Sequence, residues 1–241
     1  MDIEQLNREG YSYCDISVEE EIIDKIVSII KERHQTGEGL KKKNENFTML
    51  SQPFLIEECI KLALSDDFLA VPYMYFEGRP FYLGTCNLRR SVATHIPETT
   101  TTLFHRDKNL GGYKQTNGNF LKMFVYLSDV KEENGPFTYI RESANLVKED
   151  TRFHRQTDED IAVLYPGAEI KLVGPKGQVL TAVTTGLHKG TKVKEGYRDM
   201  FTINYCAIPE ESSVNFKIKR EVLDSLPEGK KEICKYLTIE E

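Results

Sequence analysis

The chain has 241 residues, of which 39% are hydrophobic and 10% aromatic, so it can build a sizeable core within one domain. Its formal net charge of −6 excludes a general nucleic-acid-binding protein, because that class is typically basic. No run of about 18 apolar residues occurs and the acidic N-terminus lacks an apolar signal segment, so we expect neither a membrane span nor export. The five scattered cysteines form no CxxC pair, which favours reduced thiols in a cytoplasmic protein.

Residues 1–80 are predicted to provide helical support. Ser17 and Glu20 have the spacing of a capping box, which predicts that a helix begins there. Apolar residues then recur at helical spacing, namely Val18, Ile22, Ile23, Ile26, Val27 and Ile30. A second helix is expected to begin at Pro53, because proline suits the first helical position. Its inward-facing residues would be Leu55, Ile56, Cys59, Ile60 and Leu64.

From about Phe81 the sequence consists of short β-rich runs separated by Gly, Pro, Asn and Asp. The predicted strands lie within residues 81–94, 119–130, 135–140, 168–174, 178–188 and 197–208. Short strands without intervening helices indicate an antiparallel sandwich or barrel. We therefore expect one mainly β domain over residues 1–241, in which N-terminal helices brace a jelly roll at residues 81–208. Residues 209–241 form a C-terminal extension with a helix around Gly229 to Leu237.

The segment FHRDKNLGG places His105 and Asp107 two residues apart at the end of an expected strand, where both side chains point to one face. Alone, this pair is compatible with a surface hydrogen bond, a catalytic dyad or half of a metal site, and so short a motif also occurs by chance. His188 closes a later strand run. Two histidines and one carboxylate form a triad that binds Fe(II) and leaves other positions open. A jelly roll would bring these strand ends together at its mouth.

Arg198 follows His188 by ten residues and opens the next predicted strand. A dicarboxylate bound to a metal at one end needs a cation at its other end, and the planar fork of arginine suits a carboxylate. Strand alternation would point Arg198 and Thr202 to one, more polar face. By the same alternation Asn87 and Arg89 share a face, and these two residues and Lys122 are candidates for lining the pocket.

Several segments together resemble the phytanoyl-CoA dioxygenase family. They are FHRD, LKMFVYLSDV, EENGPFTYI and GQVLTAVTTGLH with its following arginine, and the opening LNREGYSYCDISVEEEIIDKI is similar too. The resemblance covers roughly residues 5–208. It implies a double-stranded β-helix, the cupin-like form of the jelly roll, and an oxygenase that uses Fe(II), 2-oxoglutarate and O2. It also implies His105, Asp107 and His188 as metal ligands and Arg198 as the residue that binds the distal carboxylate of 2-oxoglutarate.

Two departures from the family pattern concern the surroundings of the site. Arg141-Glu142-Ser143 stands where the family usually has Gly-Ser-His, in a loop expected near the mouth of the active site, so it bears on the substrate class. Gly190 stands two residues after His188, where some relatives have a serine that helps to bind the co-substrate. Thr191 or Thr202 is expected to replace that serine in binding the co-substrate.

The expected reaction is hydroxylation of a small-molecule metabolite with release of succinate and CO2. Because Asp107 is a carboxylate, it leaves no vacant position for a halide, which favours hydroxylation or desaturation over halogenation. One alternative is a zinc or manganese hydrolase or isomerase built on the same triad, in which Arg198 would have no dicarboxylate to bind. Another is a jelly roll that binds a small ligand without chemistry. The sequence names neither the prime substrate nor an oligomeric state.

Overall fold

The computed structural model describes residues 1–44, 47–95, 97, 101–107, 119–146, 155–209 and 211–241. Its framework is a seven-stranded sheet with the order β1-β8-β5-β10-β4-β3-β2, whose neighbouring strands are all antiparallel. These strands are β1 (Tyr11–Cys14), β2 (Leu40–Asn44), β3 (Phe47–Leu50), β4 (Tyr82–Val92), β5 (Phe120–Tyr126), β8 (Val179–Ala182) and β10 (Tyr197–Cys206).

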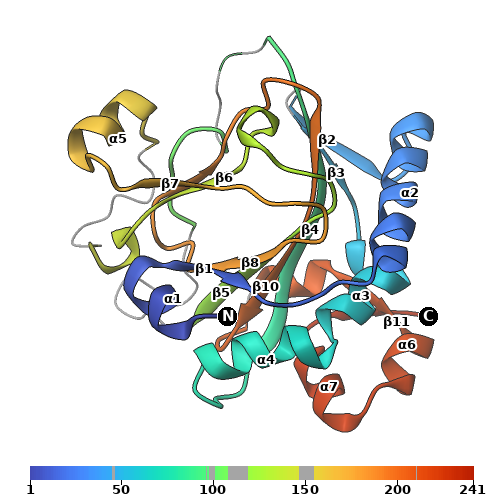
Figure 1. Cartoon of the computed structure of the whole chain (residues 1–241). Helices are drawn as coiled ribbons and strands as arrows, with labels where there is room; N and C mark the ends of the chain where they lie inside the picture. Colours follow the sequence, from blue (N-terminus) through green and yellow to red (C-terminus); the bar gives the residue numbers. More distant parts are fainter. Residues whose placement is uncertain (45–46, 96, 98–100, 108–118, 147–154, 210) are drawn as a thin grey trace.

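A second sheet has three antiparallel strands in the order β7-β6-β9. They are β6 (Phe137–Ile140), β7 (Glu169–Leu172) and β9 (His188–Gly190). Aromatic residues join the two sheets, since the rings of Phe124 on β5 and Phe137 on β6 have centroids 4.4 Å apart. The two facing sheets form a jelly roll, as the sequence predicted (Figure 1).

Helices cover the outer face of the large sheet (Figure 1). They are α2 (Glu20–Thr36), α3 (Glu57–Ala63), α4 (Asp66–Tyr75), α6 (Arg220–Ser225) and α7 (Glu228–Ile233), while α1 (Ile3–Glu9) precedes β1 and α5 (Asp158–Leu164) precedes β7. The main core lies between these helices and alternate residues of the central strands, such as Phe201 and Ile203 of β10. The other residues of β10, including Met200, face the small sheet. This alternation gives the jelly roll an inner face that is available for a site.

Each predicted strand segment contains an observed strand, but the run at residues 178–188 is divided between both sheets. β8 ends at Ala182, and β9 begins at His188. The residues between them carry the chain from the large sheet to the small one. The terminal pair of strands, β11 (Lys217–Lys219) and β12 (Thr238–Glu240), is parallel and lies in the C-terminal extension.

The predicted starts of the two N-terminal helices were wrong. Helix α2 begins at Glu20, and its N-cap Glu19 makes no capping hydrogen bond through its side chain. Ile16 and Val18 pack against the core ahead of the helix, whose N-cap is Glu19, so Ser17 does not cap it. Pro53 begins a short 3-10 helix, η1 (Pro53–Leu55), and α3 follows only after an extended residue at position 56.

The helices that the sequence did not predict are α1, α4, α5 and α6. Pro72 lies inside α4 and interrupts the sequence pattern of a helix. The C-terminal helix appears where expected, as α7, although it ends at Ile233. All five cysteines are free and buried. Among the described residues, no helix is both long enough and apolar enough to cross a bilayer.

Gly135 ends a 3-10 turn, η2 (Glu132–Asn134), with a φ of 71°. A β-carbon at this position would lie 2.3 Å from the backbone oxygen of Thr191. We expect Gly135→Ala to lower the free energy of unfolding by about 1–3 kcal/mol, because left-handed alanine is strained and the clash moves the chain beyond β9. Urea denaturation measures the loss.

The matched control is Gly37→Ala. Gly37 has a φ of 76°, but a β-carbon there would meet no atom within 4 Å. It therefore reports the cost of the backbone conformation alone. Equal losses for the two variants would show that the close approach of Thr191 to Gly135 has no energetic consequence.

Candidate metal centre and the facing arginines

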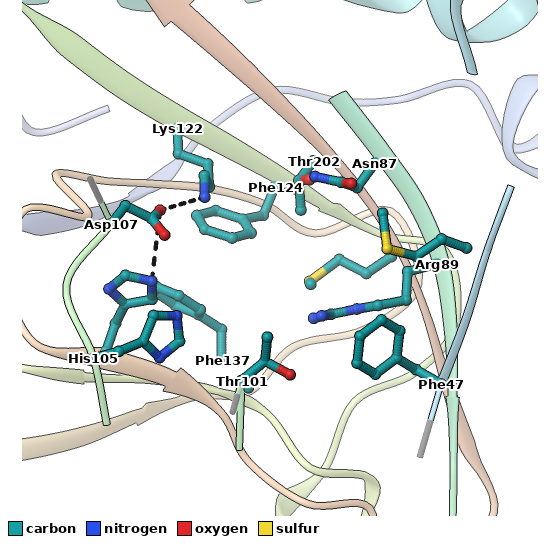
Figure 2. A pocket seen from close by; sticks show the side chains of 14 residues that line it. Phe47, Asn87, Arg89, Thr101, His105, Asp107, Lys122, Phe124, Phe137 and Thr202 are labelled. Carbon is teal, nitrogen blue, oxygen red and sulfur yellow. Dashed lines mark hydrogen bonds and ion pairs between the residues drawn. The ribbon is translucent and has the colours of Figure 1, made fainter. Parts of the chain in front are cut away.

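The three predicted metal ligands meet at one end of the jelly roll. His105 and His188 are paired through their backbones, each amide donating to the other's carbonyl at 2.9 Å. The Asp107 amide donates to the carbonyl of Thr184 at 2.9 Å, which fixes the chain after the first histidine. One ligand atom from each side chain can be chosen so that all three lie within 4.8 Å of one another. Figure 2 shows His105 and Asp107 at one side of the pocket.

Both imidazoles are held in the form that can bind a metal. His105 Nδ1 lies 2.8 Å from the carbonyl of Leu103, and His188 Nδ1 lies 2.9 Å from that of Gly186. Because a carbonyl only accepts hydrogen bonds, Nδ1 carries the proton and Nε2 keeps its lone pair. Burial lowers the pKa of His105 and lowers the pKa of His188 to about 3. Both rings are therefore neutral at neutral pH, as metal binding requires.

Lys122 lies directly beside the carboxylate of this group. Its Nζ donates to Asp107 Oδ2 at 2.5 Å, and His188 Nε2 lies 3.7 Å from the same oxygen. Burial would raise the pKa of Asp107, but the charge of Lys122 and its hydrogen bond hold that pKa below its usual range. Asp107 is thus ionised and oriented. The sequence singled out Lys122 only as a pocket residue, and β5 places it at the metal end.

A cavity of about 230 Å³ opens from the three ligands. Four further candidates from the sequence line it, Asn87, Arg89, Lys122 and Thr202. Its apolar walls include Phe124 and Phe137, one from each sheet. The cavity therefore combines a polar end, formed by the candidate metal ligands, with apolar walls.

Arg89 faces the metal ligands across this cavity (Figure 2). Its guanidinium stacks on the ring of Phe47, with 4.9 Å between Cζ and the ring centroid. Burial and the nearby charge of Arg198 lower the pKa of Arg89 to about 9, so it remains a cation at neutral pH. Strand alternation identified Arg89 as a pocket residue but gave no sign that it would stand opposite the metal ligands.

Arg198 lies behind Arg89 and does not line the large cavity. It borders an adjoining space of about 10 Å³, which is about the room that one water needs. Its side chain is buried, and Nη2 lies 3.5 Å from Ser91 Oγ. Nε and Nη1 have no hydrogen-bond partner in the described structure. Burial also lowers the pKa of Arg198.

The two threonines expected near the co-substrate occupy different places. Thr202 lines the large cavity. Thr191 borders the small space beside Arg198, but its hydroxyl is 2.6 Å from that of Thr138 and is engaged there.

The segment Arg141-Glu142-Ser143 supports the chain that leads to His188 and does not line the cavity. Ser143 Oγ accepts a hydrogen bond from the Leu187 amide at 2.8 Å. The Ser143 carbonyl accepts one from Arg106 Nη1, also at 2.8 Å. This segment therefore acts on the position of His188 from outside the pocket.

No protein-family model matches the chain, and no curated protein is similar to it in sequence. Its fold is similar to that of several solved enzymes. HygX from Streptomyces hygroscopicus, solved with nickel and 2-oxoglutarate bound, superposes with a TM-score of 0.64 at 16% identity, over 86% of this chain and 87% of HygX. SnoN, a non-heme alpha ketoglutarate dependent epimerase from nogalamycin biosynthesis, has a TM-score of 0.65 at 16% identity, covering 85% and 81%. SnoK, a carbocyclase of the same biosynthesis, has a TM-score of 0.65 at 17% identity, covering 85% and 82%. These similarities establish that the chain shares the jelly-roll fold of such enzymes.

Proposed function

We propose that the chain is a non-haem, Fe(II)- and 2-oxoglutarate-dependent oxygenase that hydroxylates a small-molecule metabolite. The observation that carries this proposal is the His105, Asp107 and His188 group, which faces an arginine across one cavity. Two neutral imidazoles and one ionised carboxylate are the donor set that suits Fe(II) with open positions. The fold shared with HygX and SnoN, each solved in a complex with 2-oxoglutarate (alpha ketoglutarate), supports the same conclusion.

Different groups of the protein would bind the metal, orient its carboxylate ligand and bind the co-substrate. Nε2 of each histidine and the carboxylate of Asp107 hold the metal, while Lys122 orients that carboxylate. When bound, iron with 2-oxoglutarate supplies an O2-dependent oxidation that releases succinate and CO2. Arg198, with Arg89 in front of it, provides positive charge for the distal carboxylate of the co-substrate. The aromatic walls keep bulk water from the reacting atoms.

The substrate side of the proposal rests on the size and polarity of the cavity. About 230 Å³ next to the ligand group admits a co-substrate and only part of a substrate, so the rest of the substrate would lie towards the mouth. The structure of HygX with hygromycin B and that of SnoN with nogalamycin RO each hold a natural product. A tailoring step on a small metabolite is the proposed role of this chain.

The test begins with anaerobic protein that is loaded with Fe(II) and titrated with 2-oxoglutarate. We expect a weak visible charge-transfer band, because the 2-oxo acid would chelate the metal, and succinate formation only after air is admitted. The His188→Ala protein should stay colourless under the same conditions. Stoichiometric zinc with full activity and no effect of 2-oxoglutarate would instead identify a hydrolase or isomerase. An absence of both the colour and succinate would also overturn the proposal.

A further inference from the structure

We propose that Arg89 and Arg198 together form one carboxylate-binding site, and that Arg89 contacts the distal carboxylate of 2-oxoglutarate as directly as Arg198 does. This inference rests on the proposed function and assigns the co-substrate's far end to two guanidiniums from neighbouring strands. It also implies that the site selects 2-oxo acids with a second carboxylate.

The strand register places the two arginines side by side. Arg198 of β10 is paired with Ser91 of β4, and Arg89 lies two residues along β4 on the same face. Such diagonal neighbours across an antiparallel pair are within reach of long side chains. Both guanidiniums therefore extend from the large sheet towards the interior of the jelly roll.

Gly190 of β9 marks the point at which they converge. A β-carbon built on Gly190 would lie 3.1 Å from Arg198 Nη2 and 3.3 Å from Arg89 Nη2. This glycine is two residues from His188, so the convergence point and the metal ligands share one short strand. The absence of a side chain at position 190 leaves the space between the guanidinium tips clear.

The two positive charges at this point favour the binding of an anion. Two cations are packed together here, and among the described residues no carboxylate forms an ion pair with either. Arg198 also has two buried nitrogens without hydrogen-bond partners. Buried donors of this kind are usually satisfied, and paired like charges in a buried site are unfavourable without a counter-charge. A carboxylate has two oxygens, which could accept hydrogen bonds from the guanidinium groups of both arginines.

The position of Arg89 identifies which kind of anion fits. Arg89 lines the large cavity opposite the candidate metal ligands (Figure 2). Arg198 borders only the small adjoining space. A molecule bound to the metal by a 2-oxo carboxylate would therefore meet Arg89 with its other end. That geometry fits a dicarboxylate and leaves a monocarboxylate without a partner for the arginines.

The experiment measures binding by calorimetry to Ni(II)-loaded protein, which does not turn over. The ligands are 2-oxoglutarate and 2-oxopentanoate, which has the same chain length but no distal carboxylate. We expect Arg89→Met and Arg198→Met each to weaken 2-oxoglutarate at least about tenfold, because each removes a charge-assisted contact. Binding of 2-oxopentanoate should stay unchanged. Arg89→Lys should recover part of the loss, since lysine keeps the positive charge but lacks the planar guanidinium with its paired donors.

A second measurement separates a binding role from a structural one. Without ligand, Arg89→Met should melt no lower than the wild type, because it removes the repulsion between the two cations. The rise in Tm that 2-oxoglutarate produces should shrink in the same variant. Arg220→Met is the control, because Arg220 is exposed, pairs with Glu241 and lies in the C-terminal extension.

The outcomes distinguish this inference from the proposed function. If the Ni(II)-loaded wild type fails to bind 2-oxoglutarate, the proposed function itself is wrong. If the wild type binds it and Arg89→Met binds it equally well, only the shared site is wrong, and Arg89 would then face the prime substrate. Equal weakening of both 2-oxo acids in Arg89→Met would also overturn the inference, because the loss would not arise from the distal carboxylate.

Discussion

Replacing His188 with alanine is expected to reduce Fe(II) affinity by well over a hundredfold and to abolish succinate formation. Loss of a residue that merely orients a ligand costs about 10–100-fold in metal affinity, and loss of the ligand itself should cost more. His105→Ala and Asp107→Ala should have the same effect, since each supplies one of the three donors that lie within 4.8 Å of one another. Metal content after anaerobic loading and desalting measures the loss.

The matched control for the histidine variants is His34→Ala. His34 lies in the last turn of α2, where its Nε2 is 2.6 Å from Thr48 Oγ1, and it does not line the cavity. This variant should retain wild-type metal content. All variants should unfold cooperatively, because the group removed contributes to the site more than to the core. Near-normal metal content in any one of the three ligand variants would remove that residue from the ligand set.

Removing the carboxylate of Asp199 is expected to lower the free energy of unfolding by about 3–5 kcal/mol, because its arginine partner would be left largely buried and unpaired. Asp199 is fully buried between the sheet and the helices, and Arg90 binds both of its oxygens, at 2.7 and 2.6 Å. The side chain of Arg90 is only 13% exposed. Urea denaturation of Asp199→Ala measures the effect.

Two further variants test the cause of that loss. Arg90→Met combined with Asp199→Leu removes both charges and should restore much of the stability, because an apolar pair has no buried charge to satisfy. Glu241→Ala removes one partner of the exposed pair with Arg220 and should change the stability little. If Asp199→Ala is as stable as Glu241→Ala, the buried pair makes no special contribution.

The sequence by itself predicted the strands within residues 81–208 and the candidate metal-binding group. Alternation of apolar and polar residues is a local property, so the run at residues 197–208 predicted both β10 and the inward direction of Thr202. His105 and Asp107 could be identified because their spacing is set within one short segment. The distant His188 was predicted as the third ligand from its place at the end of a strand run. Local patterns failed at the start of α2, which begins at Glu20, after Val18 has already packed against the core.

Only the tertiary structure decided how far each side chain reaches into the jelly roll. The sequence marked Arg198 and Arg89 as inward-facing, but their relative depth depends on the register between β10 and β4. That register pairs Arg198 with Ser91 and sets Arg89 nearer to the metal ligands. The meeting of both guanidiniums at Gly190 depends in addition on how the small sheet packs on the large one. Register and sheet packing follow from many contacts that are distant in the sequence, so no local pattern encodes them.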